Sequence, residues 1–503
     1  MSAQKSSLWT MHTFLFLGFV ILLSYLTYFH HYWEPQAVFW DENYHVASAQ
    51  KYLNGVYFME QHPPLGKLLI AAGEKILHPN ARADQYIGTD YATNFPTDFS
   101  FAGYRFFSAF LGWWTASLLF LIFLLITRNP LLSSFLSFFY IFDNALIVHI
   151  RGAMLEGPLE FFCTAMILVF LFLLEYRERQ RLFFLWSVLF GVVFALIMTT
   201  KILGLIFILL VPSILWQLLP NWRKIGRFLL CFALGFLVVY ITVWQIHFAL
   251  GKKIVSSLPD NGYYQASPEY KQILATGRSS SLLAFPIMLR DSYGYIAHYN
   301  RGTPRLDLCK PDENGSPFFD WPIGARAINY RWETPDGNTY RYLYLQSNPV
   351  VWLTTFAAVI LAICLLVGSF LAPPRPPLTH RFLLLVFTGL YVSFFVAISR
   401  ITRVLYLYHY FIPLLLGFVI AAIVLMEVKK VGRWNITEHA QTFGLLVLAG
   451  LIFVSFQFYR PLTYYEPLTD AQFARRAILP VWELSSVHGT RTNALAVAKT
   501  CGN

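Results

Sequence analysis

The sequence predicts an all-α polytopic membrane protein with about eleven spanning helices and two long polar loops on one side of the membrane. Its 503 residues are 56% hydrophobic and 13% charged, whereas soluble domains carry about 25% charged residues. Uncharged apolar runs of about 20 residues recur along the chain, which is the length that crosses a bilayer. This composition argues against a soluble enzyme, a disordered chain and a nucleic-acid-binding protein, because the polar surface that each requires is missing.

The predicted spans follow one another from residue 13 onward, with a long polar gap in the middle of the chain. They cover 13–33, 101–126, 131–150, 157–174, 182–200, 202–219, 228–248, 349–371, 382–398, 404–426 and 442–458. The first run is too long for the core of a signal peptide and lacks a small-residue cleavage site, so we expect it to be retained.

Basic residues predict the orientation of the spans, because Lys and Arg concentrate in cytoplasmic connections. Alternate short connections carry Arg128, then Arg177, Arg179 and Arg181, then Arg223, Lys224 and Arg227, and later Arg381, Lys429, Lys430 and Arg433. They account for most of the net charge of +11, so that charge needs no nucleic-acid partner. The N-terminus is then inside. We expect a transmembrane domain over 1–458, with outer loops at about 34–100 and 249–348, and an outer tail over 459–503.

An acidic pair, Asp41-Glu42, follows the first span by only a few residues. Two adjacent carboxylates beside a membrane are costly to desolvate and usually serve a purpose. One interpretation is chemical, with Asp41 as a general base and Glu42 orienting the acceptor or sharing a cation. The other is structural, because Asp is a frequent N-cap and a helical segment, 44–54, follows. The spacing alone does not decide between them.

A second polar motif, Glu60-Gln61-His62-Pro63-Pro64-Leu65-Gly66-Lys67, lies further along the same loop. Its Pro-Pro pair predicts a rigid turn, and the run 65–76 after it can re-enter the membrane as an amphipathic helix. His62 and Lys67 would then lie at the level of the lipid headgroups, where cations meet phosphate. A turn histidine and a snorkelling lysine would give the same sequence pattern.

Several ionisable residues lie inside the spans or at their ends: Arg105, Asp143, Arg151, Glu156, Lys201, Arg400, Arg403 and His409. Charged residues are rare in spans and tend to face a cavity or one another. For Asp143 we expect a structural role in an ion-pair network with Arg151 and Glu156. Arg151, Arg403 and His409 are expected at the outer surface, where their charge suits a phosphate-bearing lipid headgroup.

Taken together, the motifs resemble the protein O-mannosyltransferase family. The resemblance rests first on Phe39–His45, Tyr52–Phe58 and His62–Lys67. Four further stretches fit in the right order: Tyr104–Ala109, Phe142–Arg151, Asn348–Trp352 and Leu407–Pro413. Each fragment is weak alone, but the ordered set covers most of the chain and is specific.

The resemblance implies a GT-C membrane glycosyltransferase fold. It also implies a polyprenyl-phosphate-linked donor, typically carrying mannose, whose sugar passes with inversion to a Ser or Thr hydroxyl of an exported protein. In that reading Asp41 is the base, Glu42 takes part in acceptor binding, and Arg105, His62 and Lys67 are similar to residues that line the donor phosphate pocket. A phosphate ester is a good leaving group when cations stabilise its charge, so no nucleotide is required.

The sequence departs from the family pattern in two places. Eukaryotic members insert a β-trefoil MIR domain in the loop that is 249–348 here, and this loop is too short for one. Glu156 stands where members often have Asp. We therefore expect a prokaryotic type without the MIR domain, in a bacterial plasma membrane with its active site on the outer face. The lipid carrier, undecaprenyl or dolichyl, stays open.

Alternatives remain for the acceptor, the protein class and the metal. Related enzymes such as the aminoarabinose lipid A transferases share the acidic loop and use a lipid acceptor, so a lipid or glycan acceptor stays open. A transporter or flippase is disfavoured, because the sequence shows neither paired repeats nor half-helices broken at the midplane. A divalent cation at Asp41 and Glu42 is the one metal site suggested, since no His or Cys cluster has ligand spacing. No other cofactor is required.

Overall fold

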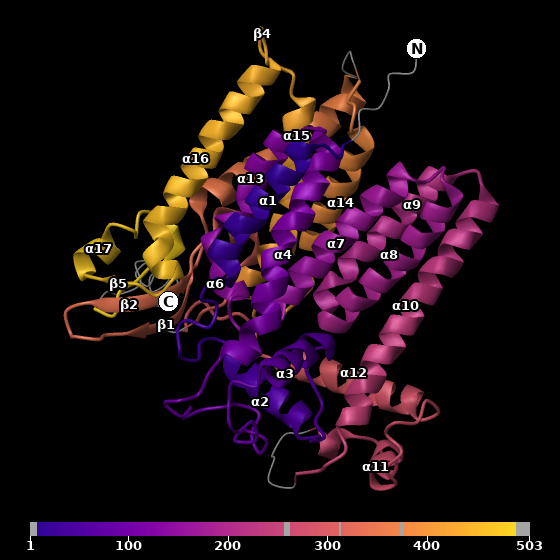
Figure 1. The fold of residues 1–503 in the computed structure, drawn as a ribbon, viewed down its shortest axis with the longest axis vertical. Helices are drawn as coiled ribbons and strands as arrows, with labels where there is room; N and C mark the ends of the chain where they lie inside the picture. The colour runs from indigo at the N-terminus through magenta and orange to yellow at the C-terminus, as the bar shows by residue number, and fades with distance from the viewer. Residues whose placement is uncertain (1–7, 256–261, 311–312, 373–376, 489–503) are drawn as a thin grey trace. The chain divides into compact units, whose positions relative to one another are not determined.

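The computed structural model describes residues 8–255, 262–310, 313–372 and 377–488. The chain divides into two compact units, each assembled from segments that are distant in sequence. Unit 1 comprises residues 1–30, 113–148 and 306–503, and unit 2 comprises residues 31–112 and 149–305. Helices dominate both units, as Figure 1 shows in chain order.

Among the described residues, nine helices are long and apolar enough to cross a membrane. Those of unit 1 are α1 (Met11–Ser24) continuing into η1 (Tyr25–Phe29), α13 (Pro349–Leu371), α14 (Arg381–Ile398), η5 (Leu407–Tyr410) with α15 (Phe411–Glu427), and α16 (Glu438–Thr463). Those of unit 2 are α7 (Glu156–Glu175), α8 (Gln180–Thr200) and α10 (Trp222–Leu250), while α4 (Ala102–Thr127) runs from unit 2 into unit 1. The prediction of an all-α polytopic fold is confirmed.

A tenth candidate span is a bent pair of helices, α5 (Pro130–Ile141) and α6 (Asn144–Ile150), with 63° between them. Asp143 lies at the break. Its carboxylate accepts hydrogen bonds from the N–H of Leu146 at 2.9 Å and from Nε1 of Trp352 at 2.8 Å. Asp143 therefore caps the start of α6 and ties it to α13, so its role is structural and is carried by hydrogen bonds.

The predicted span at 202–219 is shorter than a full crossing. It forms the 3-10 segment η2 (Ile202–Leu209) and then α9 (Leu210–Leu218), which together fall below the length of the other spans. The turn into η2 is tight, because a Cβ on Gly204 would lie 2.1 Å from the Ile197 side chain of α8. Apolar composition alone does not reveal such a change of helix type, so eleven full spans was an overcount.

In unit 2, α8 and α10 pack with their backbones in close contact. A Cβ on Gly191 of α8 would lie 2.1 Å from the carbonyl oxygen of Phe232, and one on Gly235 of α10 would lie 2.2 Å from that of Val188. Only glycine fits at both positions, as is usual where membrane helices approach closely. The two helices thus form a rigid support for the polar segments of this unit.

Those polar segments gather at one end of α10 (Figure 1). They are α2 (Glu42–Leu53), α3 (Leu65–Leu77), η3 (Tyr263–Gln265), α11 (Pro268–Ala275) and α12 (Phe285–Gly302). Buried Val46 and Tyr52 of α2 pack with Ile70 of α3 and Tyr104 of α4 in one hydrophobic core. The Tyr52 hydroxyl also lies 2.8 Å from Nδ1 of His247, which joins α2 to α10.

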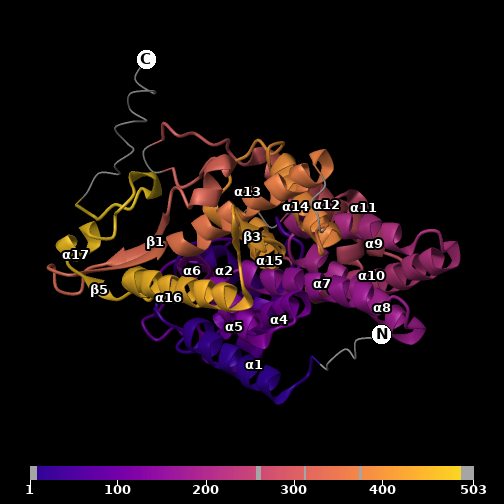
Figure 2. The same cartoon turned by 90° about the horizontal axis from the view of Figure 1, so that it is seen from above.

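Unit 1 adds a small sheet to its helices. The strands are β1 (Ile328–Glu333), β2 (Tyr340–Leu345) and β5 (Pro467–Leu468), antiparallel in the order β1-β2-β5, and they follow η4 (Phe318–Ile323). The tail therefore pairs with the loop before α13, and its segments α17 (Asp470–Ala474) and η6 (Pro480–Trp482) help to bury an aromatic core. Figures 1 and 2 both place α17 and the sheet beside the last turns of α16. A second hairpin pairs β3 (Lys430–Val431) with β4 (Trp434–Asn435).

Candidate active site

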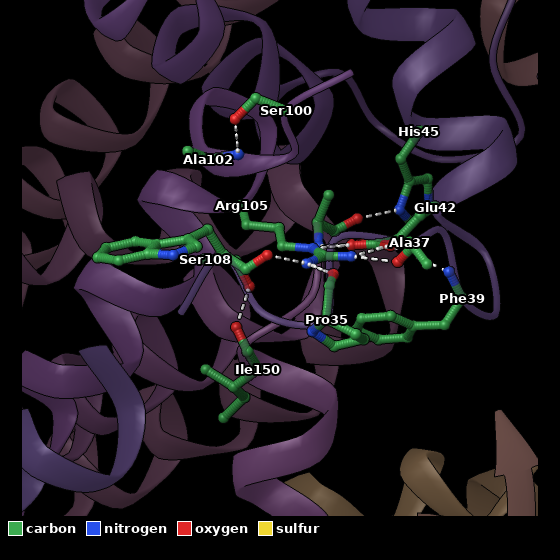
Figure 3. Close-up of polar contacts among 12 residues, drawn as sticks. Pro35, Ala37, Phe39, Glu42, His45, Ser100, Ala102, Arg105, Ser108 and Ile150 are labelled. Carbon is green, nitrogen blue, oxygen red and sulfur yellow. Dashed lines mark hydrogen bonds and ion pairs between the residues drawn. The ribbon is translucent and has the colours of Figure 1, made fainter. Parts of the chain in front are cut away.

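Arg105, in the first turns of α4, holds the segment that carries the acidic pair (Figure 3). Its Nε and Nη2 donate to the two carboxylate oxygens of Glu42 at 2.6 and 2.8 Å. Nη1 donates to the carbonyl oxygens of Trp33 and Pro35 at 2.8 and 2.7 Å, and Nη2 to that of Ala37 at 2.8 Å. All five N–H donors of the guanidinium are thus used.

The carboxylate oxygens of Glu42 likewise all take part in hydrogen bonds. Besides the two bonds from Arg105, it accepts the N–H of Phe39 at 3.1 Å and the N–H of Ala153 at 2.8 Å. The side chains of Glu42 and Arg105 are both 0% exposed. A buried ion pair is stable when its remaining hydrogen bonds are satisfied in this way. The arrangement favours a positioning role for both residues over direct contact with acceptor or phosphate.

Asp41 is the free carboxylate of the pair. It occupies the N-cap position of α2, but its side chain makes no capping hydrogen bond. It also accepts none from any other side chain or N–H in the described part of the chain, and it is half-buried. The preceding residue, Trp40, has a positive φ of 50°, which is uncommon for an aromatic residue and fixes the angle at which the chain enters α2. The capping interpretation of Asp41 is therefore not the one the geometry favours.

The surroundings of Asp41 raise its pKa to about 6, chiefly through burial and secondly through the negative charge of Glu156. His149, Lys201 and Lys67 act in the opposite direction and keep the pKa from rising further. A carboxyl group in this range is ionised at neutral pH and yet basic enough to accept a proton. Asp41 is thus partly exposed, has no hydrogen-bond partner among the described residues for its carboxylate, and has a pKa suited to a general base.

A buried polar cluster on α6, α7 and the end of α8 supplies three of the charged or polar groups that shift the pKa of Asp41. Nε2 of His149 lies 2.8 Å from one carboxylate oxygen of Glu156, and Nζ of Lys201 forms an ion pair with the other. Sequence reasoning noted Glu156 and Lys201 as charges in spans but did not assign them to the site, and it missed His149. A signal was available, since His149 lies within the family-like stretch Phe142–Arg151, seven residues before Glu156.

Lys67, on α3, lies in a second buried cluster. Its Nζ pairs with the Glu60 carboxylate and donates to the Ser48 hydroxyl at 3.1 Å. Ser48 in turn donates to Glu60 at 2.6 Å. Glu60 thus orients Lys67 while leaving one ammonium proton for a further acceptor.

Two histidines of the loop are kept neutral. Burial and the nearby lysines hold the pKa of His62 well below its usual range. Burial lowers the pKa of His45 to about 3, and its Nδ1 lies 2.6 Å from the carbonyl oxygen of Ala153. His62 is half-buried and makes no hydrogen bond within the described residues. A neutral imidazole of this kind can donate one hydrogen bond without adding charge.

The remaining predicted donor-site residues divide between the units. Arg151 is in unit 2, buried, with Nη2 donating to the carbonyl oxygen of His31 at 2.5 Å. Arg403 and His409 are in unit 1. Arg403 is half-buried, and the buried ring of His409 stacks on Trp321 with Nδ1 3.0 Å from the carbonyl oxygen of Tyr406. The structure therefore gathers His62, Lys67 and Asp41 within unit 2.

The described residues include no group of three or more His, Cys, Asp or Glu side chains placed to hold a metal ion. At the acidic pair itself, both oxygens of Glu42 already accept hydrogen bonds from Arg105 and from the backbone. The donor set left for a cation there is the Asp41 carboxylate alone. The predicted metal position therefore has too few protein ligands for a divalent cation.

Solved structures identify the class of fold. The chain matches the Saccharomyces cerevisiae protein O-mannosyltransferase Pmt1-Pmt2 complex bound to the sugar donor with a TM-score of 0.78 and 14% identity, over 94% of this chain and 93% of that chain. The protein therefore has the fold of the GT-C membrane glycosyltransferases and, with its apolar helices, is an integral multi-pass membrane protein.

The family follows from sequence models. The model of dolichyl-phosphate-mannose-protein mannosyltransferases matches residues 18–256, and that of the C-terminal four TMM region of protein-O-mannosyltransferase matches residues 296–482. The chain belongs to this family, which confirms the resemblance seen in its motifs. Protein O-mannosyl-transferase 2 of Danio rerio is 27% identical over 50% of this chain and 34% of its own length. Dolichyl-phosphate-mannose--protein mannosyltransferase 1 of Saccharomyces cerevisiae is 24% identical over 48% of this chain and 30% of its own length. The alignments thus span about a third of the relatives.

Proposed function

We propose that this protein transfers mannose from a polyprenyl phosphate to Ser or Thr hydroxyls of exported proteins, with inversion at the sugar. The observation that carries the proposal is the Asp41 carboxylate, which accepts no hydrogen bond from the described residues, has a pKa of about 6 and belongs to a segment held by the buried pair of Glu42 and Arg105. The family and the names of its relatives support the donor and the acceptor class.

In the proposed step, the acceptor oxygen attacks C1 of the mannose while the bond from C1 to the phosphate oxygen breaks. Asp41 takes the hydroxyl proton, and the bonding electrons leave with the polyprenyl phosphate. Because bond formation and cleavage occur on opposite faces of C1, one displacement inverts its configuration. Lys67, Lys201 and neutral His62 are proposed to stabilise the leaving phosphate, since the two lysines lower the pKa of both Asp41 and His62 and so act on both side chains.

We also infer that the reaction occurs on the outer face of the membrane. Support comes from the basic residues, which concentrate in the connections opposite to the loop that carries Asp41. The short loop before α13 favours a bacterial plasma membrane. Accessibility of a single cysteine introduced at exposed Gln36 to a membrane-impermeant maleimide in intact cells tests the side, and labelling only after lysis would contradict it.

The acceptor class is tested by product analysis. Purified protein is incubated with radiolabelled polyprenyl-phosphate mannose, a Ser/Thr-rich exported protein and membrane lipid in the same reaction. We expect label in the protein, released by β-elimination, which marks an O-linked sugar. Label in the lipid fraction instead would assign a lipid acceptor, and absence of label in both would contradict the proposed transfer.

The rate should depend on pH through Asp41. Burial places its pKa at about 6, and the base must be ionised to accept a proton. We therefore expect kcat/KM to fall about tenfold per pH unit below about pH 6 and to level off above it. The measurement is the initial rate of transfer between about pH 5 and pH 8. A profile that is flat through pH 6 would contradict the assignment of the base.

Chelation of divalent cations is expected to leave the rate unchanged. The oxygens of Glu42 are already used, so Asp41 alone makes a weak cation site. The measurement compares initial rates in EDTA with those in added Mg²⁺ or Mn²⁺. A rate that EDTA abolishes and one of these ions restores would instead place a cation at Asp41.

A further inference from the structure

A basic pocket that is remote from Asp41 lies where α7 ends and α8 begins. It has a volume of about 320 Å³ and is lined by the turn between α7 and α8 and by the start of α10. Between the pocket and Lys201, α8 runs for 21 residues, a distance of about 30 Å. This is the thickness of a bilayer core, so the pocket is separate from the candidate active site.

The pocket carries excess positive charge. Its lining contains Arg177, Arg223, Lys224 and Arg227 but only one acid, Glu178, so its net charge is four minus one, or +3. The Glu178 side chain is 82% exposed, and its oxygens lie 3.4 Å from Nζ of Lys224 and 3.6 Å from Nε of Arg177. Exposed pairs of this kind are worth little. Arg223 makes no hydrogen bond or ion pair with any other described residue.

Aromatic rings, rather than carboxylates, support two of the cations. Nζ of Lys224 lies 5.3 Å from the ring centroid of Phe183, and Cζ of Arg227 lies 5.8 Å from that of Phe184. Both rings come from the first two turns of α8. Such cation–π contacts hold the side chains in place without neutralising them. The charges remain available to an anion in the pocket.

Two tryptophans fix the depth of this region. Trp216 near the end of α9 and Trp222 at the start of α10 are each 72% exposed. Exposed tryptophans next to the ends of spans mark the interface between hydrocarbon and water. The basic pocket therefore opens at the level of the lipid headgroups, where a phosphate diester is the most abundant anion.

We propose that this pocket binds the phosphate group of an anionic phospholipid headgroup. The orienting effect of basic residues requires only that Lys and Arg lie in a connection. That effect does not require the basic residues to line one pocket or to make cation–π contacts with aromatic rings. Free phosphate offers the same chemistry, but the flanking tryptophans and the exposed apolar residues further along α10, such as Leu230 and Leu234, favour a ligand that is part of the membrane.

The test is lipid retention by the whole protein. Wild type is reconstituted in nanodiscs of phosphatidylcholine with phosphatidylglycerol, extracted, and examined by native mass spectrometry. We expect bound phosphatidylglycerol in wild type and about thirtyfold weaker retention in Arg223→Gln/Arg227→Gln. Lys430→Gln/Arg433→Gln removes two exposed cations from the β3–β4 hairpin and should retain the lipid. Equal retention in all three proteins would overturn the proposal.

A gain-of-function variant separates the proposal from a failure to fold. Glu178→Gln removes the single acid of the pocket and should tighten retention roughly two- to fivefold; unchanged or weaker retention would count against the site. A final arm adds inorganic phosphate to the lipid-loaded wild type. Lipid that resists millimolar phosphate supports a headgroup site, whereas its complete displacement would reassign the pocket to free phosphate and overturn the lipid assignment.

Discussion

Replacing Asp41 by asparagine is expected to lower the rate of mannosyl transfer by about 10²- to 10⁴-fold, which is the usual contribution of a general base. Asparagine preserves the shape of the side chain and removes only its ability to take a proton. The fold should not suffer, because the Asp41 carboxylate makes no hydrogen bond within the described residues. The measurements are the initial rate with radiolabelled donor and the midpoint of thermal unfolding in detergent.

A matched control is Asp84→Asn. Asp84 is also a carboxylate of the first polar loop, but it is half exposed and pairs with exposed Arg82. Its loss should change neither the rate nor the unfolding midpoint. An Asp41→Asn variant that transfers mannose at the wild-type rate would remove Asp41 from the mechanism.

Replacing Arg105 by methionine is expected to lower the free energy of unfolding by about 3–5 kcal/mol, because it leaves the Glu42 carboxylate buried without its partner. The same change releases the carbonyl oxygens of Trp33, Pro35 and Ala37. The segment that presents Asp41 would lose its anchor, so kcat should fall as well. Denaturant unfolding in detergent and steady-state kinetics measure the two effects.

Two further variants separate positioning from donor binding. Arg82→Met removes an exposed arginine and should change stability by less than about 1 kcal/mol. In Arg105→Met/Glu42→Leu no unpaired charge stays buried, so part of the lost stability should return while the rate remains low. If Arg105→Met raises only the KM for the lipid donor and leaves stability unchanged, Arg105 contacts the donor phosphate as the sequence first suggested.

Hydrophobic runs predicted most of the fold, because a bilayer demands long uncharged helices and the sequence displays them directly. The exceptions depend on tertiary contacts. The bend at Asp143 needs Trp352, which is far away in the sequence, and the short segment η2 depends on a tight turn against α8. The pairing of β2 with β5 likewise joins the loop before α13 to the tail, and no local sequence pattern predicts this pairing.

The location of the site could be predicted from the sequence, but the role of each residue within it could not. Asp41 and Glu42 are adjacent and chemically alike. The sequence could not show that Glu42 pairs with Arg105, 63 positions away, while the Asp41 carboxylate has no hydrogen-bond partner in the described part of the chain. The same holds for Lys67, whose partner Glu60 was visible in the motif although the pairing was not. His149 was overlooked because one histidine in an apolar run is usually a core residue.

The stereochemistry of the product tests the central claim most directly. A single displacement with Asp41 as the base predicts that mannose reaches the Ser or Thr oxygen with the anomeric configuration opposite to that in the donor. NMR of a glycosylated Ser/Thr peptide, made by the wild-type protein from a donor of known configuration, measures this. Complete inversion is the expected result. Retention of configuration would require either two successive displacements or attack from the face of the leaving phosphate, and would contradict the account.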